Sequence, residues 1–247
     1  CFVPYKNSVD IQLIRSADTM QARKDFIRPF NWNEVLYRVQ ILEDPEEYTV
    51  LLDFHHLVID GTSLSVLLRE ISLAYEGEAL PAEEATQYSL GIYEEMLAQS
   101  AEYAGAKSYF DAIYAGLDSN ANLPADYAED SGRKNKPAAT ITLRSLEGLS
   151  SARLEEFALL NSITVNTVLL GGFEYTLAKY SAESELILCT ANHGRHDSRL
   201  QNTVGMMVRT LPLYVQIEEE QRVAEFLKNV QENLLGAMEH DVYPFLQ

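Results

Sequence analysis

The sequence predicts an α/β protein built of two lobes joined by a linker. Its 247 residues suffice for one large or two small domains, and 47% of them are hydrophobic against 23% charged. Strand-like and helix-like hydrophobic periods alternate along both halves of the chain, which favours layered α/β architecture. With 12 Gly and 8 Pro, the composition excludes collagen-like and low-complexity chains.

The first lobe is expected over residues 1–116. Apolar and polar side chains alternate in three segments, which predicts half-buried strands at 9–13, 35–42 and 48–56. A short helix over 19–26 ends before Pro29.

An amphipathic helix is predicted over residues 62–76, followed by further helical pattern over 84–116. Thr62 or Ser63 is expected to cap the first of these helices. Its apolar stripe consists of Leu64, Leu67, Leu68, Ile71 and Tyr75.

The second lobe is expected over residues 139–247, after an aperiodic linker at 117–138. Strands are predicted at 140–146, 185–191 and 206–217, and helices from about 151, after Thr164, and over 223–239. The helix after Thr164 interrupts its apolar pattern at Gly171-Gly172, which invites close packing. Its apolar face is predicted to comprise Val165, Val168, Leu169, Phe173 and Leu177.

The net charge and the cysteine content limit which binding partners and which cellular compartment are expected. A net charge of −18 repels a phosphate backbone, so no nucleic-acid partner is expected. Apolar runs stay shorter than the ~18 residues that span a bilayer, so no membrane association is expected. Cys1 and Cys189 are too few for a disulfide framework, which fits the cytoplasm. The chain opens at Cys1 without a signal-like pattern, so we expect an excised fragment.

The segment from Asp53 to Ser63 carries the most informative polar residues. If the strand continues through it, His56 shares an apolar face with Phe54, and His55 points to the opposite side. The two histidines are therefore not expected to act as one chelating pair. Partial burial and the start of the next helix both favour a neutral imidazole at His56, the form that accepts a proton near pH 7.

Asp60 lies four residues beyond His56, in the turn before the helix. Its carboxylate could orient the imidazole, cap the helix or pair with an arginine elsewhere in the chain. Because Gly61 follows it, turn chemistry is the default interpretation.

Six ordered motifs resemble those of the condensation domains of nonribosomal peptide synthetases, within the superfamily that includes chloramphenicol acetyltransferase. The central one is His55-His56 with Asp60-Gly61, the HHxxxDG motif, followed by Ser63. The others are Pro29-Phe30 with Leu36-Tyr37-Arg38-Val39, Leu123-Pro124-Ala125-Asp126, Asn192-His193-Gly194-Arg195, the segment 204–213, and His240-Asp241-Val242-Tyr243-Pro244-Phe245.

The resemblance implies two incomplete α/β sandwich lobes of the chloramphenicol-acetyltransferase type and an acyltransferase activity. It implies that His56 faces a tunnel and positions, or deprotonates, the amine of an acceptor aminoacyl thioester that attacks a donor acyl thioester. The Gly61 amide becomes a candidate donor to the developing oxyanion. His55 and Asp60 are expected to be structural, with Asp60 paired to an arginine, and Ser63, Arg195 and Arg209 are secondary candidates near the tunnel.

The same resemblance implies that no cofactor or metal binds directly, because phosphopantetheine arms arrive on partner carrier proteins. Upstream and downstream peptidyl carrier proteins and an adjacent adenylation domain are the expected partners. The arginine-rich motif that normally pairs with Asp60 would lie before Cys1, and the segment completing the second lobe would follow Gln247. Arg209 stands where the pattern commonly has Asn. The activity of this chain alone therefore stays open.

Two alternatives remain beside amide formation. An epimerisation domain shares HHxxxDG, and a non-catalytic docking fragment would keep the fold without turnover. Heterocyclising relatives replace the histidines by aspartates, so His55 and His56 argue against that activity.

Other polar residues point to weaker candidates. His193, His196 and Asp197 form an HxxHD pattern on a predicted loop, but a third ligand cluster for zinc is lacking, so no metal site is expected. His240 is interpreted as a charge partner of a helix C-terminus. Met206 and Met207 are interpreted as core residues.

Overall fold

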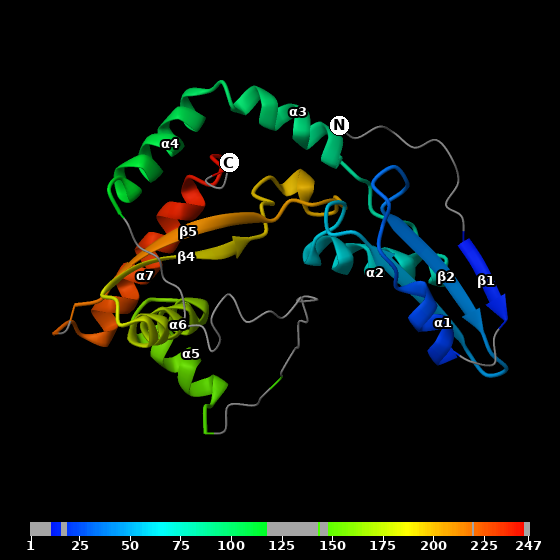
Figure 1. Ribbon diagram of the computed structural model, residues 1–247, viewed down its shortest axis with the longest axis horizontal. Helices are drawn as coiled ribbons and strands as arrows, with labels where there is room; N and C mark the ends of the chain where they lie inside the picture. The colour runs from blue at the N-terminus through cyan, green and yellow to red at the C-terminus, as the bar shows by residue number, and fades with distance from the viewer. Residues whose placement is uncertain (1–10, 16–18, 118–142, 144–147, 219, 245–247) are drawn as a thin grey trace, which may run out of the picture. The chain divides into compact units, whose positions relative to one another are not determined.

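The computed structural model describes residues 11–15, 19–117, 143, 148–218 and 220–244 of the chain. It confirms a mixed α/β fold (Figure 1). The chain divides into two compact units. Unit 1 comprises residues up to Leu97 together with His193–Arg209, and unit 2 comprises Ala98–Asn192 and residues from Thr210 onward.

Unit 1 contains a three-stranded sheet in the order β1-β2-β3, whose strands lie side by side in Figure 1. Strand β1 (Ile11–Arg15) runs parallel to β2 (Tyr37–Glu43), and β2 runs antiparallel to β3 (Tyr48–Phe54). Helix α1 (Thr19–Phe26) connects β1 to the segment that leads into β2, as a parallel pair requires a crossover. The strand and helix predictions for this region are confirmed to within a few residues.

The described part of unit 1 also contains helix α2 (Gly61–Glu76), helix α3 (Gln87–Leu97) and the short helix η1 (Ser198–Leu200). The N-cap of α2 is Asp60, whose carboxylate accepts from the Ser63 amide, so the predicted caps Thr62 and Ser63 are wrong. The helix already begins at Gly61, which places Thr62 and Ser63 inside its first turn. The helix ends at Gly77 in the left-handed conformation, with φ of 78°.

The apolar stripe predicted for α2 is mostly exposed within the described part of the chain, with Leu68 at 51% and Tyr75 at 93%. The buried residues of this helix are Ser63 and Val66 instead. Polar contacts to the start of α2, described below, therefore decide which side of the helix packs.

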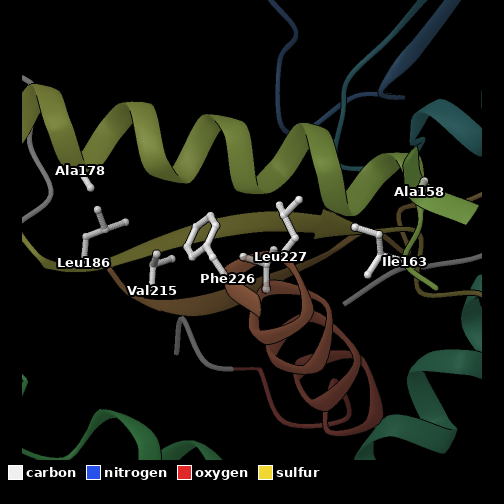
Figure 2. Close-up of a cluster of buried hydrophobic side chains, with 8 residues drawn as sticks. Ala158, Ile163, Ala178, Leu186, Val215, Phe226 and Leu227 are labelled. Atoms are coloured by element: carbon white, nitrogen blue, oxygen red, sulfur yellow. The ribbon is translucent and has the colours of Figure 1, made fainter. Parts of the chain in front are cut away.

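In the described part of unit 2, a two-stranded sheet, β4 (Glu185–Asn192) and β5 (Arg209–Gln216), is combined with four helices. These are α4 (Ala101–Tyr114), α5 (Ser151–Leu160), α6 (Val165–Ser181) and α7 (Val223–Glu239). Figure 2 shows Leu186 and Val215 of the strands and Phe226 and Leu227 of α7 gathered next to α6, with Ala178 above them. A second cluster centres on Phe110, Leu211, Leu213 and Ala237.

The apolar face predicted for α6 is confirmed in part, because Val165, Val168 and Leu177 are partly buried and pack against the core cluster. Leu169 and Phe173 are 52% and 59% exposed. The buried residues are Thr167, Gly171, Glu174 and Ala178. Small residues let α7 approach closely, because a Cβ at Gly171 would lie 2.4 Å from Leu227 Cδ2. The close packing predicted for the glycine pair is thus confirmed at Gly171, whereas Gly172 faces open space.

The compact units differ from the expected division at residues 1–116 and 139–247. Helix α4 groups with unit 2 because Phe110 packs in the core with β5 and α7. Residues 193–209 group with unit 1 because Arg195 is buried against Asp60. The linker prediction at 117–138, the strand at 140–146 and the motif at 123–126 lie outside the described residues, except for residues 117 and 143.

Within the described residues, no single helix is long and apolar enough to span a membrane. The pair α5 and α6 passes that test only when the two helices are joined across a bend of 97°.

Candidate active site

The two histidines of the HHxxxDG motif lie in different surroundings. Strand β3 ends at Phe54, so neither histidine belongs to a strand and the predicted alternation stops before them. The amide of His55 donates to the Leu36 carbonyl at 2.9 Å, and its Nδ1 accepts from the Leu57 amide at 3.0 Å. The His55 ring also contacts the rings of Phe30 and Trp32, with centroids 5.8 and 4.9 Å away. His55 is thus held in place from several sides.

His56 lies in the turn that follows and is exposed to solvent. The partial burial predicted for it is therefore wrong, because the chain leaves the sheet two residues earlier than expected. The turn is closed by a hydrogen bond from the Val58 amide to the His55 carbonyl at 3.0 Å. An exposed imidazole in an ordered turn is accessible to a substrate amine or carbonyl group.

Asp60 is the centre of a buried polar network and is 2% exposed. Its carboxylate accepts from Arg195 in a bidentate pair at 2.9 and 3.0 Å, from the Ser63 amide at 2.8 Å and from the Met207 amide at 2.9 Å. Burial by itself would raise the pKa of this carboxyl group. The hydrogen bonds from Arg195 and the two amides outweigh burial and lower the pKa to about 2.

The arginine that pairs with Asp60 is Arg195, so the expectation that this partner precedes Cys1 is wrong. Of the three roles left open for Asp60, the structure gives it two, helix cap and arginine partner. A partner 135 residues away could be found only from tertiary structure.

Arg195 and Ser63 are both buried, and their expected place near a tunnel stays a prediction. Beyond Asp60, the Arg195 guanidinium donates to the Ser63 hydroxyl and to the carbonyl groups of His193 and Thr203. Its Nε is buried without a hydrogen-bond partner among the described residues. These two side chains therefore connect chain segments rather than offering an open polar surface.

The backbone of the segment from His193 to Met207 adopts a conformation that allows the hydrogen bonds to Asp60 and Ser63. Gly194 has φ of 65°, and a Cβ there would lie 1.9 Å from the Met207 carbonyl oxygen. Gln87 exchanges hydrogen bonds with the Met206 backbone, and Met207 is 4% exposed, as the core interpretation predicts. The backbone groups of Thr203, Gly205, Met206 and Met207 bond to side chains, and β5 begins at Arg209 rather than at the predicted residue 206.

Gly61 is the first residue of α2 and is exposed. Its amide belongs to the first turn, whose N–H groups have no intrahelical acceptor. A Cβ at this position would meet nothing within 4 Å. The position is therefore open, and its proposed role as an oxyanion donor stays a prediction.

Arg209 forms an ion pair with Glu94 of α3, with side-chain exposures of 21% and 45%. The longer cation that replaces the common Asn of the family pattern thus has a carboxylate partner inside unit 1.

The HxxHD residues are engaged in other contacts. His193 Nδ1 accepts from the Arg195 amide at 2.9 Å, and the Asp197 carboxylate binds Arg199. Hydrogen bonds from Arg199 lower the pKa of Asp197 to about 2. Among the described residues, no group of three or more His, Cys, Asp or Glu side chains is arranged to hold a metal ion.

His240 follows the last residue of α7. Its Nδ1 lies 2.8 Å from the Gly236 carbonyl oxygen, and its ring stacks on Tyr109 at a centroid distance of 3.9 Å. The location at the helix C-terminus is as predicted.

Sequence reasoning missed Gly205, whose backbone contacts both Ser63 and Asp60. It also missed Glu174, a glutamate that is 1% exposed in α6. Both lie inside otherwise apolar segments, where a lone Gly or Glu is the signal that could have identified them.

Comparison with known proteins identifies the family. The family model for the Condensation domain matches residues 6–247. Bacitracin synthase 3 from Bacillus licheniformis is 30% identical over 224 residues, covering 90% of this chain and 4% of that protein.

Two solved structures share the fold. The first condensation domain of the CDA synthetase is 22% identical, with a TM-score of 0.70, and the match covers 98% of this chain and 56% of that chain. The X-domain from teicoplanin biosynthesis is 21% identical, with a TM-score of 0.79, and the match covers 99% and 57%. This chain therefore spans just over half of either solved chain and a small part of the curated synthetase. The family match over nearly all of the sequence shows that the chain belongs to the Condensation domain family.

Proposed function

We propose that this chain is the central part of a condensation domain that forms an amide bond between two carrier-bound thioesters. The observation that carries the proposal is His56, an exposed imidazole in a turn that is fixed on its C-terminal side by the buried Asp60–Arg195 pair. A solvent-accessible base beside a rigid helix start is what an aminolysis site needs.

In the proposed reaction, the amine nitrogen of the acceptor aminoacyl thioester attacks the carbonyl carbon of the donor thioester. The new C–N bond forms, the C–S bond breaks, and the sulfur leaves as the thiol of the donor arm. His56 orients the amine and accepts the proton that it loses, and that proton returns to the leaving sulfur. The Gly61 amide donates to the oxygen that becomes negative during the attack.

Asp60 acts through structure in this proposal and does not touch the substrate. Its carboxylate already accepts four hydrogen bonds inside the protein, which uses its lone pairs. His55 likewise has its Nδ1 occupied by the Leu57 amide. Among the motif side chains, His56 is the one presented for chemistry.

The substrates in this proposal arrive on phosphopantetheine arms of an upstream and a downstream peptidyl carrier protein. An adjacent adenylation domain would load the downstream carrier. No metal or soluble cofactor is required for aminolysis of a thioester, which is activated already. The low cysteine content remains the basis for expecting a cytoplasmic enzyme.

The proposal is tested by incubating the full chain with a donor carrier and an acceptor carrier, each loaded with an aminoacyl thioester. Mass spectrometry of the acceptor carrier should detect a dipeptide, and His56→Ala should reduce its rate of formation by roughly 10²–10⁴-fold, the usual contribution of general acid–base catalysis. Leu57→Ala, a truncation at the next exposed residue, serves as the matched control and should leave the rate unchanged.

Three results would replace the proposal. A dipeptide that forms equally well in His56→Ala contradicts the role of the imidazole. An acceptor residue whose α-carbon is inverted without a new amide bond identifies an epimerisation domain. Carrier binding without any product identifies a docking fragment.

A further inference from the structure

The Ser63 hydroxyl uses its full hydrogen-bonding capacity in the interior of unit 1. The residue is 0% exposed. Its Oγ donates to the Gly205 carbonyl at 2.7 Å and accepts from the Gly205 amide at 2.9 Å and from Arg195 Nη2 at 2.6 Å. One donor and two acceptor sites are all that a hydroxyl possesses.

These contacts tie two distant chain segments together at a single residue. Ser63 lies in the first turn of α2, and Gly205 is 142 residues further along the chain. The Gly205 carbonyl accepts a second hydrogen bond, from the Asp60 amide at 3.2 Å, and the Asp60 carboxylate accepts from the Met207 amide. The backbone at residues 205–207 is thus hydrogen-bonded to Asp60 and Ser63, which follow the His56 turn.

Removal of the Ser63 hydroxyl breaks the hydrogen bonds to Gly205 but leaves the other contacts of Asp60 in place. In Ser63→Ala, both Asp60–Arg195 hydrogen bonds and the Asp60 helix cap retain their partners. The Gly205 amide, in contrast, loses its acceptor in a buried place. An unsatisfied buried amide drives the surrounding backbone to shift or to admit water.

We propose that Ser63 is a positioning residue for His56, a role that rests on the amide-forming function proposed above. By holding Gly205 against the start of α2, the hydroxyl fixes the C-terminal end of the turn that carries the imidazole. The N-terminal end of that turn is fixed by β3 and by the contacts of His55. Reactions between two tethered groups depend on alignment, and a misplacement of about 1 Å costs on the order of 10²-fold in rate.

The test measures dipeptide formation by the full chain in single turnover with loaded carriers, per mole of folded protein. Ser63→Ala should lower the rate at saturating carrier by roughly 10- to 100-fold while the carrier concentration giving half-maximal rate stays within about twofold of the unaltered chain. The matched control is Ser65→Ala on the same helix, because among the described residues that exposed hydroxyl donates a hydrogen bond only to the Gly61 carbonyl, at 3.3 Å. It should retain the full rate.

A second variant covers the case in which Ser63→Ala does not fold. Ser63→Cys keeps a weaker donor and acceptor of similar size. If Ser63→Ala folds, the rate of Ser63→Cys should lie between the rates of Ser63→Ala and the unaltered chain. If Ser63→Ala does not fold, the rate of Ser63→Cys should lie at least roughly threefold below that of the unaltered chain.

A spectroscopic readout separates positioning from stability. In the chain labelled at its five histidines, the His56 ring signal is assigned by its disappearance in His56→Ala. In Ser63→Ala this signal should shift or broaden, whereas in Ser65→Ala it should not change.

The outcomes separate the two proposals. Dipeptide formation by the unaltered chain with an equal rate in Ser63→Ala, or in Ser63→Cys if the alanine variant is unfolded, overturns the positioning role and leaves the function intact. An unchanged His56 signal in Ser63→Ala also overturns it. Absence of dipeptide from the unaltered chain overturns the proposed function, and the role of Ser63 falls with it.

Discussion

Asp60 in unit 1 and Glu174 in unit 2 are both buried carboxyl groups, yet their pKa values shift in opposite directions. Asp60 receives a bidentate arginine and two amides, and its pKa is lowered to about 2. Glu174 has one carboxyl oxygen that is buried without a hydrogen-bond partner among the described residues, and burial raises its pKa to about 7. Partners rather than depth therefore decide whether a buried acid carries charge.

The opposite pKa shifts of Asp60 and Glu174 reflect the different structural settings of the two residues. Asp60 caps a helix and joins it to residues 193–207, so its charge organises the site around His56. Glu174 occupies the buried face of α6, among the residues that allow α7 to pack closely. A neutral carboxyl group is compatible with that apolar surrounding.

Loss of the arginine should produce the largest effect. Arg195→Ala leaves the Asp60 carboxylate buried without its cation, which costs about 3–5 kcal/mol of unfolding free energy. Urea unfolding at pH 7 measures this change as a lower midpoint at constant slope. Arg199→Ala is the matched control, because its partner Asp197 is a surface residue, and it should lower the urea midpoint far less than Arg195→Ala. Equal losses in the two variants would contradict the buried role of Arg195.

The second-largest effect is expected for Glu174→Gln, which should raise the unfolding free energy where Arg195→Ala lowers it. Because its folded pKa of about 7 lies above the ordinary value of 4.5, the folded state loses stability as pH rises from about 4.5 to 7. Glu174→Gln removes this loss and should be more stable than the unaltered chain by about 3 kcal/mol at pH 8, with little difference near pH 4. Urea midpoints across that range measure it.

Glu155→Gln, at an exposed position on α5, controls for the removal of one negative charge. A gain from Glu174→Gln that is the same at pH 4 and pH 8 would show that Glu174 stays ionised or finds a partner.

The third effect is the loss of unfolding free energy at low pH that is caused by protonation of Asp60. Its folded pKa of about 2 lies below the ordinary 3.8, so its contribution is complete above about pH 3.8 and is lost as pH falls toward 2. The unaltered chain should lose about 2 kcal/mol over this interval relative to Asp60→Asn, measured by urea unfolding. Parallel pH profiles for the two proteins would mean that the arginine pair does not depress the pKa.

The smallest effect is expected for the Arg209–Glu94 pair, which is only partly buried. A double-mutant cycle with Arg209→Ala and Glu94→Ala should give a coupling of about 0.2–1 kcal/mol in unfolding free energy. A coupling above about 3 kcal/mol would place this pair with Asp60–Arg195 instead.

Local patterns predicted most elements but only part of the helix faces that are buried. The bounds of α1 and α7 follow from helix-ending residues and hydrophobic period, and both match the prediction. In α6, periodicity correctly placed Val165, Val168 and Leu177 against the core, but it did not predict that Gly171 and Glu174 are fully buried. In α2 the buried residues are Ser63 and Val66, beside the Asp60 network, and the predicted apolar stripe is mostly exposed.

The candidate site was identified through its motif, together with the expectation that Asp60 pairs with an arginine, whereas the identity of that arginine and the contacts of Gly205 were not predicted. The positions of His55, His56 and Asp60 follow from seven consecutive residues. Arg195 and Gly205 reach Asp60 and Ser63 from more than 130 residues away, and a single sequence contains no information on such pairings.

The most direct measurement pairs rate and stability in the single variant His56→Ala. Because this imidazole is exposed and Asp60, Ser63 and Arg195 supply the buried contacts, its removal should leave the urea midpoint unchanged within about 0.5 kcal/mol of unfolding free energy. The rate of dipeptide formation between loaded carriers should fall by roughly 10²-fold or more. A retained rate, or a rate lost only in proportion to unfolded protein, would contradict the assignment of His56 as the group that acts on the substrate amine.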